Sequence, residues 1–170
     1  LIRNANSAIA NISSADALSS DEKNQLLGEL YVLRAMAYYD LTRFYGDVPF
    51  FTDELGTDEL SVLPRTSMSE IRLRMKEDLA QAKTYLPDSY SGADLGRMTK
   101  WAAAGLKAKF HLFDNEWTEC LSECVDIINN SPHTLMDNFV DVYAYDKTTL
   151  GNEVKNEHIL WVDFAGNTAL

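Results

Sequence analysis

The chain has 170 residues, of which 46% are hydrophobic, and its 15 Lys and Arg against 26 Asp and Glu give a formal net charge of −11. This length is sufficient for a compact domain with a core, and the uninterrupted apolar runs are too short to cross a bilayer. Phosphate contacts need clustered Lys and Arg, so the acidity argues against a nucleic-acid or anionic-membrane partner.

The N-terminal sequence LIRNANSAIANISS lacks an initiator Met and the pattern of a secretory signal peptide. We expect the chain to be a mature, excised or truncated piece, with its targeting information elsewhere. A short first helix is predicted from Ile2 to Ile12.

A long second helix is predicted to follow. Ser19 and Glu22 have the spacing of a capping box, and Gly46 and Pro49 suit the end of a helix. Between them, steps of three and four predict one buried apolar stripe: Leu26, Leu30, Leu33, Ala37, Leu41 and Phe44. A second, amphipathic stripe is predicted from the heptad spacing of Tyr31, Tyr38 and Tyr45.

Two arginines in this helix could suggest a chemical site, but nothing near them resembles a nucleophile with a base. We expect Arg34 and Arg43 to lay their stems along the helix surface and to direct their charges to water or carboxylates. The segment is therefore interpreted as structural.

The region from Phe50 to Ser67 has no helical period and is predicted to be a long loop, a feature that is often functional when ordered. Ser67 and Glu70 then have capping-box spacing. A third helical stripe is predicted on the following residues, before Pro87 ends the helix: Ile71, Met75, Leu79, Ala82 and Leu86.

An antiparallel helical hairpin is predicted next, because only Asp114 to Glu116 separates two helical patterns. The first pattern covers Thr99 to Phe113. The second begins at Trp117 and predicts a buried stripe: Trp117, Cys120, Leu121, Cys124, Val125 and Ile128. From Lys100 to Pro132 the hairpin is close to the length of a tetratricopeptide unit.

The C-terminal part changes character. A short helix is predicted around Met136 to Tyr143, and EHILWVDFAG has the composition of one strand. The predicted fold class is therefore all-α in the main, with tetratricopeptide-like antiparallel helical pairs, long loops and little strand.

No metal, cofactor or catalytic site is predicted. Cys120 and Cys124 are expected to be core residues and not a disulfide, since neighbouring helical turns seldom satisfy bridge geometry. The three histidines lie on different elements: His111, His133 and His158. Adjacent carboxylates give no glycosidase arrangement, and phosphate-binding, zinc-protease and serine-hydrolase motifs are absent.

Aromatic residues in irregular segments are the remaining feature of interest: Phe50, Phe51, Tyr90, Trp161 and Phe164. Such rings can form platforms for the apolar face of a ligand, or they can simply cover the helical layer. The sequence leaves both alternatives open.

With its segments in order, the chain resembles the SusD/RagB family of outer-membrane nutrient-binding lipoproteins. GELYVLRAMAYYDLTRFYGDVPFFTDE is similar to the family signature, and its matching positions are Glu29, Leu33, Arg34, Ala35, Gly46, Asp47, Val48 and Pro49. LIRNANSAIANI, PRTSMSEIRLRMKEDLAQAKTYLPDS, GRMTKWAAAGLKAKFHLFDNEWTECLSECVDIINNS and NEHILWVDFAGN resemble its other segments. The chain departs from the family pattern at Lys109, Cys120 and Cys124.

The resemblance implies that residues 1–170 form a single SusD-like helical region of a longer, surface-exposed outer-membrane lipoprotein, whose lipid anchor is absent from this chain. It implies docking on a TonB-dependent transporter and non-catalytic binding of an oligosaccharide or another nutrient. We expect ligand contacts from Trp161, Phe164 and Asn167, which follow the break in helical order, and a lesser one from Asp53. The alternatives are a tetratricopeptide-like protein-interaction module without its own small-molecule site and, third, a small acidic glycoside hydrolase.

Overall fold

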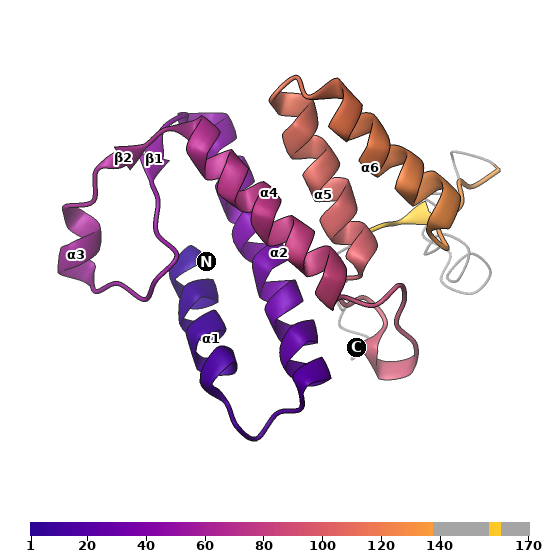
Figure 1. Cartoon of the computed structure of the whole chain (residues 1–170), viewed down its shortest axis with the longest axis horizontal. Helices are drawn as coiled ribbons and strands as arrows, with labels where there is room; N and C mark the ends of the chain where they lie inside the picture. The colour runs from indigo at the N-terminus through magenta and orange to yellow at the C-terminus, as the bar shows by residue number, and fades with distance from the viewer. Residues whose placement is uncertain (138–156, 161–170) are drawn as a thin grey trace, which may run out of the picture.

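The computed structural model describes residues 1–137 and 157–160, and it is mainly α-helical, as predicted (Figure 1). Two very short strands, β1 (Val48–Pro49) and β2 (Arg65–Thr66), form an antiparallel pair. A 3₁₀ turn, η1, covers Gly92–Asp94. The α-helices in the described part are α1 (Ile2–Ser14), α2 (Ser20–Tyr45), α3 (Thr57–Ser61), α4 (Met68–Tyr85), α5 (Lys100–Phe113) and α6 (Trp117–Asn130).

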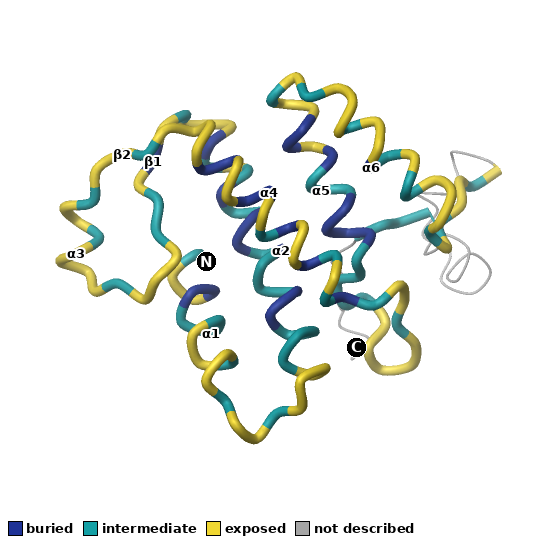
Figure 2. The backbone as a smooth tube through the Cα atoms, viewed as in Figure 1, coloured by how far each residue is buried: buried dark blue, intermediate teal, exposed yellow. Residues whose placement is uncertain are grey.

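The long helices lie side by side: α1 packs on α2, α2 on α4, α4 on α5, and α5 on α6 (Figure 1). The core lies where α2, α4 and α5 meet (Figure 2). Its fully buried members include Val32, Tyr38, Met75, Leu79 and Phe110. The α5–α6 pair is the predicted antiparallel hairpin.

The α4 stripe is confirmed, because Ile71, Met75, Leu79 and Ala82 are 0% exposed and Leu86 is 5% exposed. The prediction that the apolar stripe from Leu26 to Phe44 is the buried stripe of α2 is wrong: its members are only partly buried, and Phe44 is 69% exposed. The buried residues of α2 are Leu27, Gly28, Val32, Arg34, Ala35, Tyr38 and Thr42. Since α2 packs against α1, α4 and α5, its buried residues spread over several faces of the helix and do not follow the predicted apolar row.

The burial of the tyrosine stripe differs along α2. Tyr38 is fully buried, Tyr31 is half-buried and Tyr45 is 70% exposed. The Tyr38 hydroxyl accepts from the Phe51 amide at 3.0 Å and lies 3.1 Å from the Phe51 carbonyl oxygen, to which it donates. This ring therefore attaches the start of the long loop to the core.

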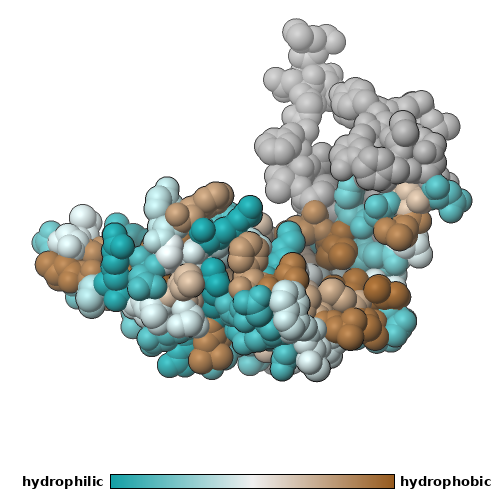
Figure 3. Space-filling view, turned by 90° about the horizontal axis from the view of Figure 1, so that it is seen from above, coloured by the Kyte–Doolittle hydropathy of each residue, from teal (hydrophilic) through white to brown (hydrophobic). Residues whose placement is uncertain are grey.

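The apolar stripe of α6 is not buried, contrary to the prediction. Trp117, Leu121 and Ile128 are between 61% and 76% exposed, and Cys120 and Cys124 are half-buried. Figure 3 shows apolar residues gathered on the side of the molecule that carries α5 and α6. The interpretation of the cysteines as core residues was wrong, because both are only partly buried and the buried residue of α6 is Glu123.

Glu123 is the one buried residue of α6, a helix that the structure describes in full. Its carboxylate accepts hydrogen bonds from the Nζ atoms of Lys83 on α4, at 2.5 Å, and Lys107 on α5, at 2.9 Å. Lys83 also donates to Asp126 at 3.1 Å. Burial alone would raise the pKa of Glu123, but the two lysine donors outweigh it and hold the pKa below its ordinary value.

This network predicts a loss of stability in acid. A carboxyl whose pKa is lower in the folded than in the unfolded state stabilises the fold above the unfolded value, about pH 4.5, and that contribution disappears as the pH falls through the folded-state pKa. Glu123→Gln should therefore reduce the dependence of the free energy of unfolding on pH between about 5 and 3. Urea unfolding at several pH values measures it. The control is Glu119→Gln on the exposed face of α6, and equal slopes in the two variants would refute the assignment.

The predicted long loop is closed at its base by the β1–β2 pair, and it contains α3, which was not predicted because five residues are too few to show a period. The Ser67 hydroxyl accepts from the Glu70 amide at 3.3 Å, which confirms the cap, although the structure shows no reciprocal bond from the Glu70 side chain. Asp47 of the signature adds a second cap by accepting from the Met68 amide at 2.8 Å.

The predicted helix around Met136 to Tyr143 lies mostly outside the described residues, as do residues 161–166 of the predicted strand. Residues 157–160 contain no strand. The Glu157 carboxylate accepts from the Met136 amide at 2.7 Å, which ties the described end of the chain to the segment after α6.

Candidate functional site

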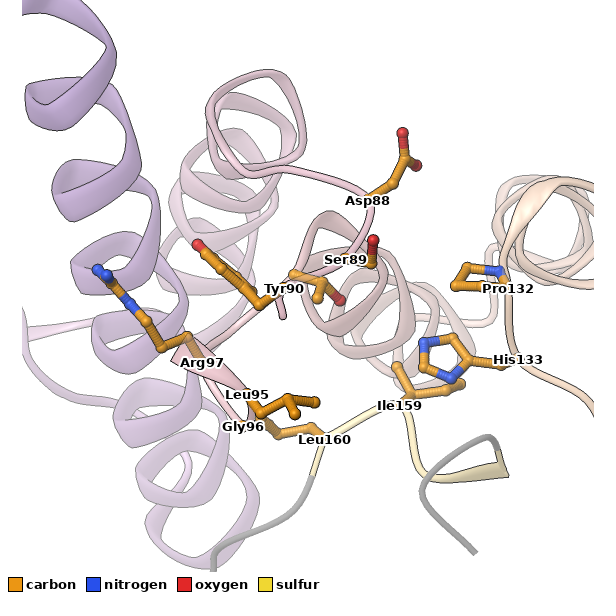
Figure 4. A pocket seen from close by; sticks show the side chains of 11 residues that line it. Asp88, Ser89, Tyr90, Leu95, Gly96, Arg97, Pro132, His133, Ile159 and Leu160 are labelled. Carbon is orange, nitrogen blue, oxygen red and sulfur yellow. The ribbon is translucent and has the colours of Figure 1, made fainter. Parts of the chain in front are cut away.

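A pocket of about 180 Å³ lies at one end of the helical layers, where three segments meet (Figure 4). The connection between α4 and α5 supplies residues 88–90, 95–97 and 99. Pro132 and His133 come from the segment after α6, and Ile159 and Leu160 from the last described segment. Segments far apart in sequence thus form one concave surface.

The walls of the pocket are mainly apolar. Leu95 and Leu160 lie on one side, and Ile159 and Pro132 close another (Figure 4). Ile159 also approaches α5, where its Cγ2 lies 3.9 Å from the position that a Cβ on Gly105 would occupy. Such walls suit a ligand that presents carbon-bound hydrogens, with polar groups needed only at the edge.

One aromatic ring, that of Tyr90, is held in the wall by charged groups. The Arg97 guanidinium lies 5.4 Å from the centre of the Tyr90 ring. Arg97 Nε and Nη2 donate to the two carboxylate oxygens of Glu29, at 2.8 and 3.1 Å, and Nη1 donates to Asp94 at 3.1 Å. A two-pronged bond of this kind fixes the plane of the guanidinium and thereby supports the ring.

The shifts in the pKa values of Arg97 and Tyr90 agree with this arrangement. The hydrogen bonds from Arg97 to Glu29 raise the pKa of the guanidinium, so Arg97 stays charged. Burial, and then the Glu29 carboxylate, raise the pKa of the Tyr90 hydroxyl, which stays neutral at physiological pH. Tyr90 is therefore a neutral ring with a fixed cation beside it.

The polar groups of the pocket lie at its rim. Asp88 forms an ion pair with Lys100 at 2.5 Å, and Ser89 is next to it. Thr99 is the residue before α5, yet its hydroxyl makes no cap bond. The Thr99 Oγ1 atom is enclosed and has no hydrogen-bond partner among the described residues. An enclosed hydroxyl without a partner is unusual.

The predicted ligand residues Trp161, Phe164 and Asn167 lie outside the described residues. Ile159 and Leu160, directly before Trp161, do line the pocket.

Asp53 lies elsewhere, in the exposed connection between β1 and α3, at the other end of the long axis (Figure 1). Its carbonyl accepts from the Asn6 side chain at 3.3 Å. The structure therefore does not bring Asp53 to the pocket.

The sequence left two roles open for the aromatic residues of irregular segments: a platform for a ligand, or a cover for the helical layer. Phe50 packs on the core against Tyr38, with ring centres 5.0 Å apart, which supports the second role for Phe50. Tyr90 is the described aromatic that lines the pocket. Sequence reasoning noticed Tyr90 but missed Glu29 and Arg97 as its support. Both stand in the motifs that carried the family resemblance, and only the fold shows that they meet.

The described residues contain no group of three or more His, Cys, Asp or Glu side chains arranged to hold a metal ion. Adjacent Glu77 and Asp78 point apart, since Glu77 pairs with Arg74 and Asp78 with Arg34. His111 contacts Glu116 in the turn between α5 and α6, where Lys76 also binds Glu116. No helix in the described part is long and apolar enough to cross a membrane.

Comparison with known proteins gives the same result at the levels of sequence and fold. Residues 1–112 match a SusD-like family model described as "Starch-binding associating with outer membrane". SusD-like protein P25 of Formosa agariphila is 36% identical over 166 residues, which are 97% of this chain and 30% of that protein.

Two solved structures have the same fold. A SusD-like protein of Bacteroides fragilis superposes with a TM-score of 0.86 at 27% identity, over 98% of this chain and 32% of the other. Surface glycan-binding protein A of Bacteroides fluxus superposes with a TM-score of 0.75 at 25% identity, over 86% of this chain and 31% of the other. The chain thus spans about a third of the length of these relatives. Its sequence and its fold together show that it belongs to the SusD-like family.

Proposed function

We propose that this chain is the helical region of a nutrient-binding protein that captures neutral glycans at the outer membrane without cleaving them. The observation that carries the proposal is the pocket, whose apolar walls and supported Tyr90 ring suit the carbon face of a sugar. The name of the 25% identical structure, a surface glycan-binding protein, supports the same ligand class. Docking on a TonB-dependent transporter, surface exposure and a lipid anchor complete the proposal at the level of the whole protein.

Calorimetric titration with a panel of neutral oligosaccharides tests the ligand class. It should use this chain and the intact native protein that contains it. Binding by both would support a site on the segments described above. Binding by the intact protein alone would make this chain a scaffold, and binding by neither would contradict glycan capture. Release of reducing sugar would support the hydrolase alternative instead.

Trp161 gives a sharper test, since it directly follows the pocket residues Ile159 and Leu160. In the intact protein, Trp161→Ala should weaken oligosaccharide binding about tenfold, the size of one lost stacking contact, and change Tm by only a few degrees. The matched control is Trp117→Ala on α6, a 61% exposed tryptophan that is not among the pocket residues. A large fall in Tm with unchanged affinity would identify Trp161 as a core residue.

A second candidate function, protein interaction, is favoured by the exposed stripe of α6. Trp117, Leu121, Val125 and Ile128 form an apolar surface typical of a binding face. Deleting residues 99–130 from the intact protein and measuring retention of its transporter without glycan tests this role. Unchanged retention would exclude the hairpin as a docking element.

A further inference from the structure

We propose that the pocket is a subsite for a single neutral pyranose ring, which stacks on Tyr90, and that Glu29 and Arg97 are the residues that position Tyr90. This inference rests on the proposed glycan-binding function. It adds that one uncharged sugar ring of the ligand enters the pocket, and that Tyr90 contacts this ring.

The size of the pocket sets the size of the group that enters. Its volume is about 180 Å³, and an apolar cavity of about 150 Å³ is known to hold benzene. One six-membered ring therefore fits, and two linked rings do not. A pyranose also matches the lining, because its ring faces carry hydrogens on carbon while its hydroxyls point outward from the edge.

The charge of the pocket argues for a neutral ring. Arg97 is satisfied by Glu29 and Asp94, and Asp88 is paired with Lys100. An anionic sugar would find no uncompensated cation on these residues, and it would have to compete with Glu29 for Arg97.

The positioning role follows from where Arg97 lies. In Figure 4, Arg97 is on the side of the Tyr90 ring away from Pro132 and His133, so the cation supports the ring from behind. Arg97 is in turn held by Glu29 of α2, which lies 68 positions earlier in the sequence. The Glu29 side chain is 19% exposed. Without Glu29 the guanidinium would lose its fixed plane, and the Tyr90 ring would lose its support.

The experiment measures binding of methyl pyranosides of neutral hexoses, and of the matching disaccharides, to the full chain by saturation-transfer NMR and calorimetry. Tyr90→Ala should weaken the binding of the glycoside and of the disaccharide by the same factor, at least tenfold, because each ligand places one ring in the pocket. Tyr90→Phe should recover most of that loss. Glu29→Gln should weaken binding about three- to tenfold without removing the ring.

The matched control is Asp78→Asn, which disturbs the other two-pronged arginine pair, Arg34 with Asp78, among residues that do not line the pocket. Asp78→Asn should lower Tm and leave the affinity for the sugar unchanged. Glu29→Gln should lower the affinity for the sugar even at temperatures where the variant is fully folded. If oligosaccharides bind and Tyr90→Ala binds them like the unaltered chain, the subsite is wrong and glycan capture stands. If the unaltered chain binds no sugar, the subsite fails, and glycan capture fails with it only if the intact native protein also binds none.

Discussion

Asp78→Ala should lower the free energy of unfolding by about 3–5 kcal/mol, the cost of leaving a buried charge without its partner. Arg34 of α2 is 5% exposed, and its Nε and Nη2 atoms donate to Asp78 of α4 at 2.8 and 2.9 Å. Its third bond, from Nη1 to the Asn6 side chain of α1 at 2.9 Å, is to a neutral group. Removing the carboxylate would therefore leave the guanidinium enclosed with no counter-charge.

The neighbouring ion pair provides the control for that experiment. Glu77 and Arg74 are both on α4, and their side chains are both 58% exposed. Glu77→Ala should change the free energy of unfolding by less than about 1 kcal/mol, because water screens an exposed pair. Urea unfolding of both variants gives the comparison, and a loss below about 1 kcal/mol for Asp78→Ala would show that Arg34 finds another partner.

Gly28→Ala should also destabilise the fold, by about 1–3 kcal/mol, although alanine is the better helix former. A Cβ at Gly28 would lie 2.8 Å from Leu86 Cγ and 3.2 Å from Tyr85 Cβ, where the end of α4 crosses α2. Neither contact is with the free end of a long side chain, so the two helices would have to move apart. The glycine is thus required by close approach, and not by its backbone angles.

A double-mutant cycle separates this clash from other effects of the substitution. Leu86→Ala removes the nearest atoms, and in that background Gly28→Ala should cost less than it does in the unaltered chain. Thermal or urea unfolding of the four proteins gives the coupling energy. Equal costs in both backgrounds would rule out Leu86 as the cause.

Local sequence patterns correctly predicted those features that depend only on residues close together in the sequence. The Ser19–Glu22 capping box and the α4 stripe from Ile71 to Leu86 follow from short-range spacing, and both are confirmed. The three-residue connection between α5 and α6 similarly allows only a hairpin. These features depend on residues within a few turns of each other, so periodicity and capping rules describe them well.

The errors lie where burial depends on the neighbours of a helix. The stripe of α6 has perfect apolar spacing, yet Leu121 and Ile128 are exposed, and the buried residue of the helix is Glu123, which pairs with Lys83 and Lys107. On α2 the buried face shifted because three helices pack around it. Amphipathic spacing shows that a helix has an apolar face, and it does not show which face meets a neighbour.

By itself, the sequence determined the helical class, the order of the elements and the family, since these depend on local propensity and on the order of motifs. Tertiary structure alone decided the site. Glu29, Tyr90 and Arg97 come from α2 and from the connection between α4 and α5, and they meet only when the helices have packed. A pocket formed by segments distant along the chain has no local period, so no short-range pattern can describe it.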